Sequence, residues 1–218
     1  MLHKSTLDFL RHLKKYNNRE WFKRNKSLYE DARKDFEFFA GELIQKISEF
    51  DESVSGLQPD DSIFRIYRDI RFSKDKSPYK INLACDISSG GKKHKNAGYY
   101  FHLQPGNNSF LAGGLYMPEP EKLMAVRKKI LSSTPAFKGI INSRTFKKNF
   151  GKLWDGDKLK TAPKGFSKDH PDSDLLKYKS YIVSHELSDK QVLSSNAADY
   201  SARIFKSMIS MNDFLKGC

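Results

Sequence analysis

The chain has 218 residues, of which 38% are hydrophobic, 13% aromatic and 30% charged. This composition excludes an intrinsically disordered protein, and a bilayer-spanning protein is excluded because no apolar run approaches the roughly 18 to 20 residues that a membrane helix needs. The formal net charge of +13 favours an acidic partner, such as nucleic acid, a phosphorylated small molecule or an anionic membrane surface.

The opening segment MLHKSTLDFL lacks the apolar core and the small-residue cleavage site of a secretory signal peptide. Cys85 and Cys218 are the two cysteines of the sequence, and this number and placement do not suggest a disulfide framework. We therefore expect a cytoplasmic protein with ordinary free thiols and without a membrane partner.

The N-terminal part of the chain is predicted to be helical. Leu7, Leu10 and Leu13 mark a short helix that ends at an asparagine pair. Apolar residues then recur every three or four positions, which predicts one long helix over about 18–50. The same range carries seven basic and seven acidic residues, so its polar face is predicted to be solvated rather than ligand-binding.

The middle of the chain has the shorter periodicity of β-strands. Strands are predicted at about 63–69, 82–88, 97–104 and 109–117, with a further candidate at 180–187. Gly-Gly and PGNN turn signals make the connections short, which favours antiparallel pairing. Helices are predicted again after residue 118 and at about 197–215. The pattern indicates a single α+β domain with a mainly antiparallel sheet.

The segment RIYRDIRFSKDKSPYK, residues 65–80, is the densest charge cluster of the predicted sheet region. It contains six basic and two acidic residues, a net charge of six minus two, or +4. Guanidinium forks and lysine ammonium groups suit phosphate or carboxylate, and the interleaved aromatic rings can stack. An anion-binding site is predicted from Arg65, Arg68, Arg71, Lys74, Lys76 and Lys80.

Two alternatives compete with this interpretation. In the first, Asp69, Asp75 and carboxylates of the helices neutralise the arginines, and the charged segment is an internal ion-pair network. In the second, the protein is an enzyme whose arginines orient a phosphate or carboxylate while Asp69, Asp75, Tyr79 or His170 transfers a proton.

A second basic segment, residues 138–179, carries eleven basic and five acidic residues, a net charge of eleven minus five, or +6. Within it, His170 lies between Asp169 and Pro171 and is a candidate general acid or base. The plainer interpretation makes His170 a loop residue beside a helix capped by Asp169 or Asp172. His102, in a predicted strand, is expected to be hydrogen-bonded or exposed to solvent, without a ligand role.

Common cofactor and metal motifs are absent from the sequence. There is no phosphate-binding loop, no Gly-x-Gly-x-x-Gly turn, no His-Glu-x-x-His and no Cys-x-x-Cys. We therefore expect neither a cofactor nor a metal ion.

The motif FRIYRDIRFSKDKSPYK resembles the signature of a family of conserved hypothetical proteins, domain of unknown function 2461. FLRHLKKYNNREWF, GGLYMPEPEKLMAVRKKI and LKTAPKGFSKDHPDSDLLKYKSY extend the resemblance over nearly the whole chain. It implies a one-domain cytosolic α+β protein and no particular reaction. It points to one residue set in the basic motif and a second at His170 and Lys177. The first set is Arg65, Arg68, Asp69, Arg71, Lys74, Asp75, Lys76, Tyr79 and Lys80.

Overall fold

Helices form the N-terminal part of the molecule in the computed structural model, which describes residues 1–217. They are α1 (Lys4–Lys15), α2 (Arg19–Arg24) and α3 (Lys26–Ser48). The long N-terminal helix is confirmed as α3, although it is shorter than the predicted range 18–50. Asn25 separates it from α2, because the Asn25 side chain donates a hydrogen bond of 2.8 Å to the Trp21 carbonyl and competes with the backbone there.

Four antiparallel strands form one sheet in the order β1-β2-β3-β4. They are β1 (Leu83–Ile87), β2 (Gly98–Leu103), β3 (Ser109–Leu115) and β4 (Tyr181–Leu187). The strands predicted at 82–88, 97–104, 109–117 and 180–187 are therefore confirmed. The structure thus has the α+β architecture and the antiparallel sheet that the sequence predicts.

The segment 63–69, predicted as a strand, is not one of these four strands. It makes two isolated bridges, from Ile63 to Cys85 and from Tyr67 to Tyr79. Ile63 and Ile66 are both buried. Their spacing of three residues does not fit the alternation of a strand, so this stretch follows the sheet edge only briefly before it turns away.

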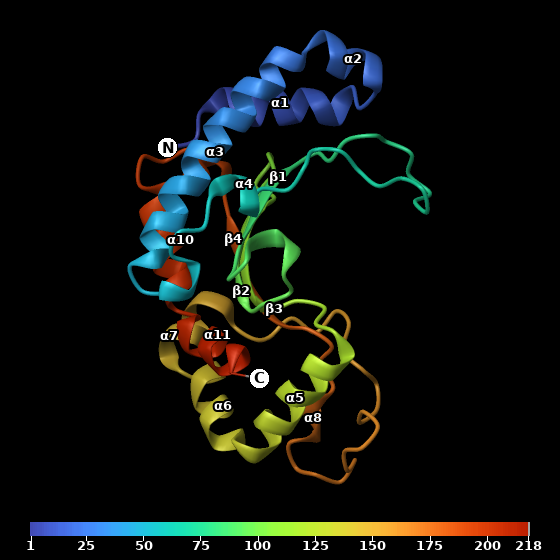
Figure 1. Ribbon diagram of the computed structural model, residues 1–218, viewed down its shortest axis with the longest axis vertical. Coiled ribbons are helices and arrows are strands. Elements are labelled where there is room, and N and C mark those ends of the chain that lie inside the picture. The colour runs from blue at the N-terminus through green and yellow to red at the C-terminus, as the bar shows by residue number, and fades with distance from the viewer. Residues whose placement is uncertain (218) are drawn as a thin grey trace.

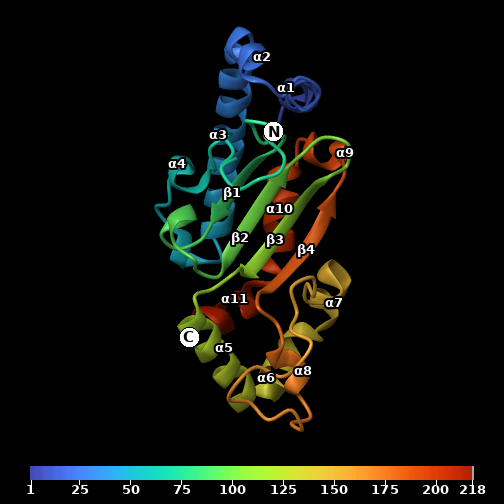
Figure 2. The ribbon, with the colours of Figure 1, turned by 90° about the vertical axis from the view of Figure 1, so that its right-hand side faces the viewer.

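One face of the sheet is covered by α3, α10 (Ala197–Lys206) and α11 (Ile209–Lys216), which lie behind the strands in Figure 2. Inward side chains of the strands meet apolar side chains of these helices; for example, the rings of Phe39 and Phe101 lie 4.8 Å apart. Both are fully buried, as is Phe36 beside them. Because every second strand residue points to this core, the intervening residues must point to the other face.

The remaining helices lie at two ends of the elongated molecule (Figure 1). At the end opposite α1 and α2 are α5 (Pro120–Ser132), α6 (Thr134–Ile141), α7 (Arg144–Phe150) and α8 (Ser173–Leu176). Shorter elements are α4 (Pro59–Ser62), α9 (Asp189–Val192) and two 3-10 helices, η1 (Glu52–Val54) and η2 (Gly91–Lys93). Within residues 1–217 no helix has both the length and the apolarity to cross a membrane.

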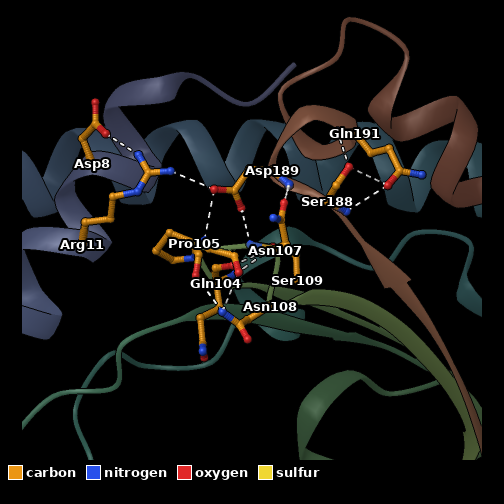
Figure 3. A network of polar contacts seen from close by, with 11 residues as sticks. Asp8, Arg11, Gln104, Pro105, Asn107, Asn108, Ser109, Ser188, Asp189 and Gln191 are labelled. Carbon is orange, nitrogen blue, oxygen red and sulfur yellow. Dashed lines mark hydrogen bonds and ion pairs between the residues drawn. The ribbon is translucent and has the colours of Figure 1, made fainter.

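A polar network joins α1 to the turn between β2 and β3 (Figure 3). The Asp189 carboxylate accepts hydrogen bonds of 3.0 Å from the backbone N–H groups of Gly106 and Asn107, and pairs with Arg11 of α1 at 2.8 Å. Burial opposes ionisation of Asp189, but these donors outweigh it and lower its pKa. The network holds α1 against the sheet and so fixes the helix that leads into the candidate site.

Candidate functional site

Residues 64–80 fold back on themselves as an irregular projection, which we call the basic arm (Figure 1). Its two sides are joined by hydrogen bonds from Arg68 N–H to the Pro78 carbonyl, 3.0 Å, and from Lys80 N–H to the Ile66 carbonyl, 2.8 Å. Pro78 lacks an N–H and cannot extend this ladder as a donor. The tip of the arm is open to solvent, and the Phe72 side chain is 96% exposed.

The base of the arm is anchored by Tyr79. Its ring stacks on Phe22 of α2 with ring centroids 4.0 Å apart. The side chain of Asn17, which follows α1, donates to the Tyr79 carbonyl at 2.9 Å and accepts from the Tyr79 N–H at 3.1 Å. Burial, and then Tyr67, raise the pKa of the Tyr79 phenol, so it stays protonated at neutral pH and is not a general base.

The two aspartates of the arm are engaged with its arginines. Asp75 pairs with Arg68, and Asp69 binds Arg71 through two nitrogens at 2.6 and 3.0 Å. The N–H and hydroxyl of Ser77, followed by Arg68, lower the pKa of Asp75 to about 2. The Arg71 guanidinium and N–H lower the pKa of Asp69. Both carboxylates are therefore ionised at neutral pH, and this part of the arm has the contacts of an ion-pair network.

A pocket of about 390 Å³ opens at the base of the arm, and we call it the arm pocket. It is lined by Lys14, Asn17, Arg68, Asp75, Ser77, Tyr79, Lys80, Ile81 and Asn82. Among these residues three side chains are cationic and Asp75 supplies the single carboxylate. The balance of charge in the arm pocket is therefore positive, even with the Arg68 and Asp75 pair in place.

Lys80 is the cation of the arm pocket that is hardest to explain as architecture. It is partly buried, its ammonium lies 5.2 Å from the centroid of the Phe64 ring, and within residues 1–217 no carboxylate pairs with it. Burial, followed by the nearby Arg65, lowers its pKa. A partly buried ammonium without a counterion is stabilised when an anion arrives, which suits the pocket to phosphate or carboxylate.

The other predicted ligand residues lie outside the arm pocket. Arg65 is exposed beside Lys80, whereas Arg71, Lys74 and Lys76 belong to the outer part of the arm. Lys76 donates a hydrogen bond of 3.1 Å to the Ile70 carbonyl. The structure thus brings Arg68 and Lys80 together in the pocket and distributes the rest over the surface of the arm.

His170 precedes α8 and Lys177 follows it, and α8 lies at the opposite end of the molecule from the arm (Figure 1). His170 lines a separate pocket of about 470 Å³, and its Nδ1 accepts a hydrogen bond of 3.1 Å from the Asp172 N–H. Lys177 pairs with Asp174 at 3.4 Å. Because proton transfer requires hydrogen-bond reach, His170 does not act together with Arg68 at one centre.

The other walls of the His170 pocket are mainly apolar. They come from Met124, Lys128, Leu131, Gly165, Phe166, Ser167 and Leu176. Asp172 precedes α8 but pairs with Lys138 instead of capping the helix with its side chain. In the part of the chain that the structure describes, no group of three or more His, Cys, Asp or Glu residues is placed to hold a metal ion.

Five residues that line the arm pocket are not among the predicted site residues: Lys14, Asn17, Ser77, Ile81 and Asn82. Lys14 and Asn17 come from the end of α1, about 60 positions before the arm base, and only tertiary packing brings them there. The asparagine pair that ends α1 is visible as a helix-stop signal, but that signal carries no information about its distant partner Tyr79.

Comparisons with known proteins identify the chain at the family level. No curated protein and no solved structure matches it. The model of one family, described as conserved hypothetical protein (DUF2461), matches residues 5–214, which include both ends of the molecule and the whole basic arm. The chain therefore belongs to the DUF2461 family of conserved hypothetical proteins.

Proposed function

We propose that this protein binds an anionic ligand, either nucleic acid or a phosphorylated metabolite, through the arm pocket. The observation that carries the proposal is the partly buried ammonium of Lys80, which has no carboxylate partner within residues 1–217. Lys14 and Arg68 line the same pocket, so a phosphate placed there meets cations from both α1 and the arm.

The ion pair between Arg68 and Asp75 is compatible with anion binding in the arm pocket, but it does not account for the other cations there. The Arg68 side chain is 25% exposed and its partner Asp75 is 61% exposed, so their pair is a surface salt bridge that contributes little to stability. The pair can orient the Arg68 guanidinium at the wall of the arm pocket and still leave it free to contact an anion. Within residues 1–217 neither Lys14 nor Lys80 forms such a pair, and an anionic ligand explains the partly buried ammonium of Lys80 better than architecture does.

The pKa values and positions of the four candidate proton-transfer residues favour a binding protein over an enzyme. Asp69 and Asp75 have lowered pKa values, Tyr79 has a raised one, and His170 lies in another pocket. None of the four is therefore poised to exchange a proton with a ligand in the arm pocket near neutral pH. We place the binding activity in the cytoplasm, where the buried free thiol of Cys85 needs no disulfide partner. Cys218 lies outside the described residues.

Thermal unfolding with candidate ligands tests the proposal. The probes are adenosine triphosphate, a sugar phosphate, citrate, and short single-stranded and duplex oligonucleotides. A ligand at 100 times its Kd stabilises the folded state by about 2.7 kcal/mol, which raises the midpoint of a chain of this size by roughly 5 to 11 °C. We expect Arg68→Ala to remain folded and to lose most of this shift.

Arg71→Ala is the matched control, because Arg71 also pairs with an aspartate of the arm but lies outside the pocket. It is expected to keep the shift. The proposal fails if no probe raises the wild-type midpoint, and an Arg68→Ala protein that melts much earlier than wild type identifies the arm as architecture instead.

A further inference from the structure

One face of the four-stranded sheet carries no helix in the described part of the molecule. Helices α3, α10 and α11 cover the face behind the strands, and the face toward the viewer in Figure 2 is open. The basic arm and the loop of residues 151–172 project from opposite ends of the molecule on this open side (Figure 1). An antiparallel sheet commonly leaves one face to solvent, so the side chains that this face carries decide what it can bind.

Aromatic rings occupy the middle of this open face. His102 of β2 lies opposite Phe110 of β3, and their rings stack with centroids 4.5 Å apart. Tyr100 lies 5.9 Å from Phe110 and 6.2 Å from Phe64 at the sheet edge. All four rings are partly exposed, and we call them the aromatic face.

The residues opposite two of these partly exposed rings are small. Ala84 of β1 lies opposite His102, and Ala112 of β3 lies opposite Tyr100. Burial lowers the pKa of His102 against the effect of its hydrogen bond to Gln104, so the imidazole is neutral at neutral pH. The His102 and Phe110 rings are nearly parallel, with an interplanar angle of 16°, so each covers one face of the other and a base would stack on the outer faces of the pair.

The aromatic face is continuous with the arm pocket. Lys80 lines the pocket and lies over the Phe64 ring, and Asn82 lines the pocket while its amide nitrogen is 3.4 Å from His102 Nδ1. Stacking surface and cationic pocket therefore adjoin each other along the β1 edge. This combination fits a ligand that has flat rings and phosphates a short distance apart.

We infer that the protein binds single-stranded nucleic acid, with bases stacked on the aromatic face and phosphates in the arm pocket. The inference rests on the proposed function and names its ligand class. A single strand exposes the faces of its bases, whereas a duplex keeps them inside the stack.

The second basic segment favours a strand over a mononucleotide. Lys160, Lys164 and Lys168 belong to the loop of residues 151–172, and the structure of residues 1–217 gives none of them a carboxylate partner. A mononucleotide would engage the arm pocket only. A strand that crosses the open face can place further phosphates near this loop, at the far end of the sheet (Figure 1).

Two carboxylates lie on the open face, and they favour contact of this face with the bases of a strand rather than with its phosphates. Asp86 lies opposite Tyr100, and Glu186 lies opposite Phe110. Each would repel a phosphate, and each can accept a hydrogen bond from the exocyclic amine of a base. They therefore favour an arrangement in which the bases lie over the sheet and the backbone follows its basic margins.

Fluorescence anisotropy of a labelled oligonucleotide of about 12 nucleotides, titrated with the full chain, tests this inference. Phe110→Leu keeps an apolar side chain but removes the ring, and Phe38→Leu is its matched control. Phe38 is 73% exposed on α3, which covers the other face. Loss of one stacked base is expected to weaken binding roughly 5- to 150-fold for Phe110→Leu, and Phe38→Leu should bind like wild type.

The outcomes separate this inference from the proposed function. Unchanged affinity in both Phe110→Leu and Tyr100→Leu, with Arg68→Ala weakened, overturns the stacking inference and retains the anion pocket. Duplex or mononucleotide binding as tight as the single strand also overturns it. If no anionic probe binds at all, both proposals fail. Circular dichroism of each variant identifies a folding defect, and the Tyr100→Leu protein provides the test if Phe110→Leu does not fold.

Discussion

Replacing Asp51 by alanine is expected to lower the free energy of unfolding by about 1 to 3 kcal/mol, since it leaves a buried hydroxyl without its hydrogen-bond acceptor. The Asp51 side chain is 4% exposed. It accepts hydrogen bonds from Lys216 of α11 at 2.6 Å and from the Tyr99 hydroxyl of β2 at 2.8 Å. The variant leaves the Tyr99 hydroxyl buried without an acceptor, which is the costlier loss because Lys216 is 21% exposed and reaches water.

Urea and thermal unfolding measure this effect, and the thermal midpoint should fall by roughly 2 to 12 °C. Asp213→Ala is the control, because Asp213 contacts the same lysine at 3.9 Å but is 62% exposed and should cost less than about 1 kcal/mol. Equal stabilities of the Asp51→Ala and Asp213→Ala proteins would contradict the account of how η1 and α11 are held together.

The Asp51 effect should depend on pH in one direction. Burial opposes its ionisation, but Lys216, Ser53 and Tyr99 outweigh this and lower the pKa of Asp51. A carboxylate with a lowered folded pKa contributes stability that is complete above its unfolded pKa, about 4, and is lost as the pH falls through the folded value. The difference between wild type and Asp51→Ala should therefore be constant near neutral pH and shrink below about pH 4.

Replacing Lys80 by methionine should change binding and stability in opposite senses. The ammonium is partly buried without a carboxylate, so its removal should leave the free energy of unfolding unchanged or raise it. Binding of an anion in the arm pocket should weaken by about 1.5 to 3 kcal/mol, or roughly 10- to 150-fold, because a charge-assisted hydrogen bond is lost. Chemical unfolding and calorimetric titration with inorganic pyrophosphate measure the two quantities.

The change in wild-type stability with pH is a second test of the role of Lys80. Its lowered pKa means that the unfolded chain binds more protons at alkaline pH, so wild type should gain stability as the pH rises toward about 10.5. Lys80→Met should lack this gain. Lys76→Met serves as control, since Lys76 bonds the Ile70 carbonyl outside the pocket. A Lys80→Met protein that is clearly less stable than wild type would assign the lysine to the architecture of the arm.

The elements with regular periodicity could be predicted from the sequence. Helix α3 has an apolar residue every three or four positions, and buried residues alternate with more exposed ones along most of β2 and β4. The segment 63–69 is predicted as a further strand because the periodicity of its sequence is close to two. That prediction failed because Ile63 and Ile66 are both buried, so the burial pattern does not alternate there.

The candidate site could be predicted only in part. Arg68 and Lys80 stand out by local charge density, but Lys14, Asn17 and Asn82 have no distinctive local signal and reach the pocket through the packing of α1 on the arm base. The aromatic face was missed for a related reason. Tyr100 and His102 fit an ordinary strand, and the sequence does not reveal which sheet face the helices leave open.

The central claim, that the arm pocket binds an anion, is tested most directly by a two-dimensional proton–nitrogen NMR spectrum during titration with inorganic pyrophosphate. The side-chain amides of Asn17 and Asn82 report from the pocket wall, and the backbone amides of Ser77 and Lys80 report from the arm base. We predict that chemical-shift changes gather at these positions and saturate with one binding constant. Changes spread evenly over the lysine-rich surface, or confined to the loop of residues 151–172, would contradict the claim.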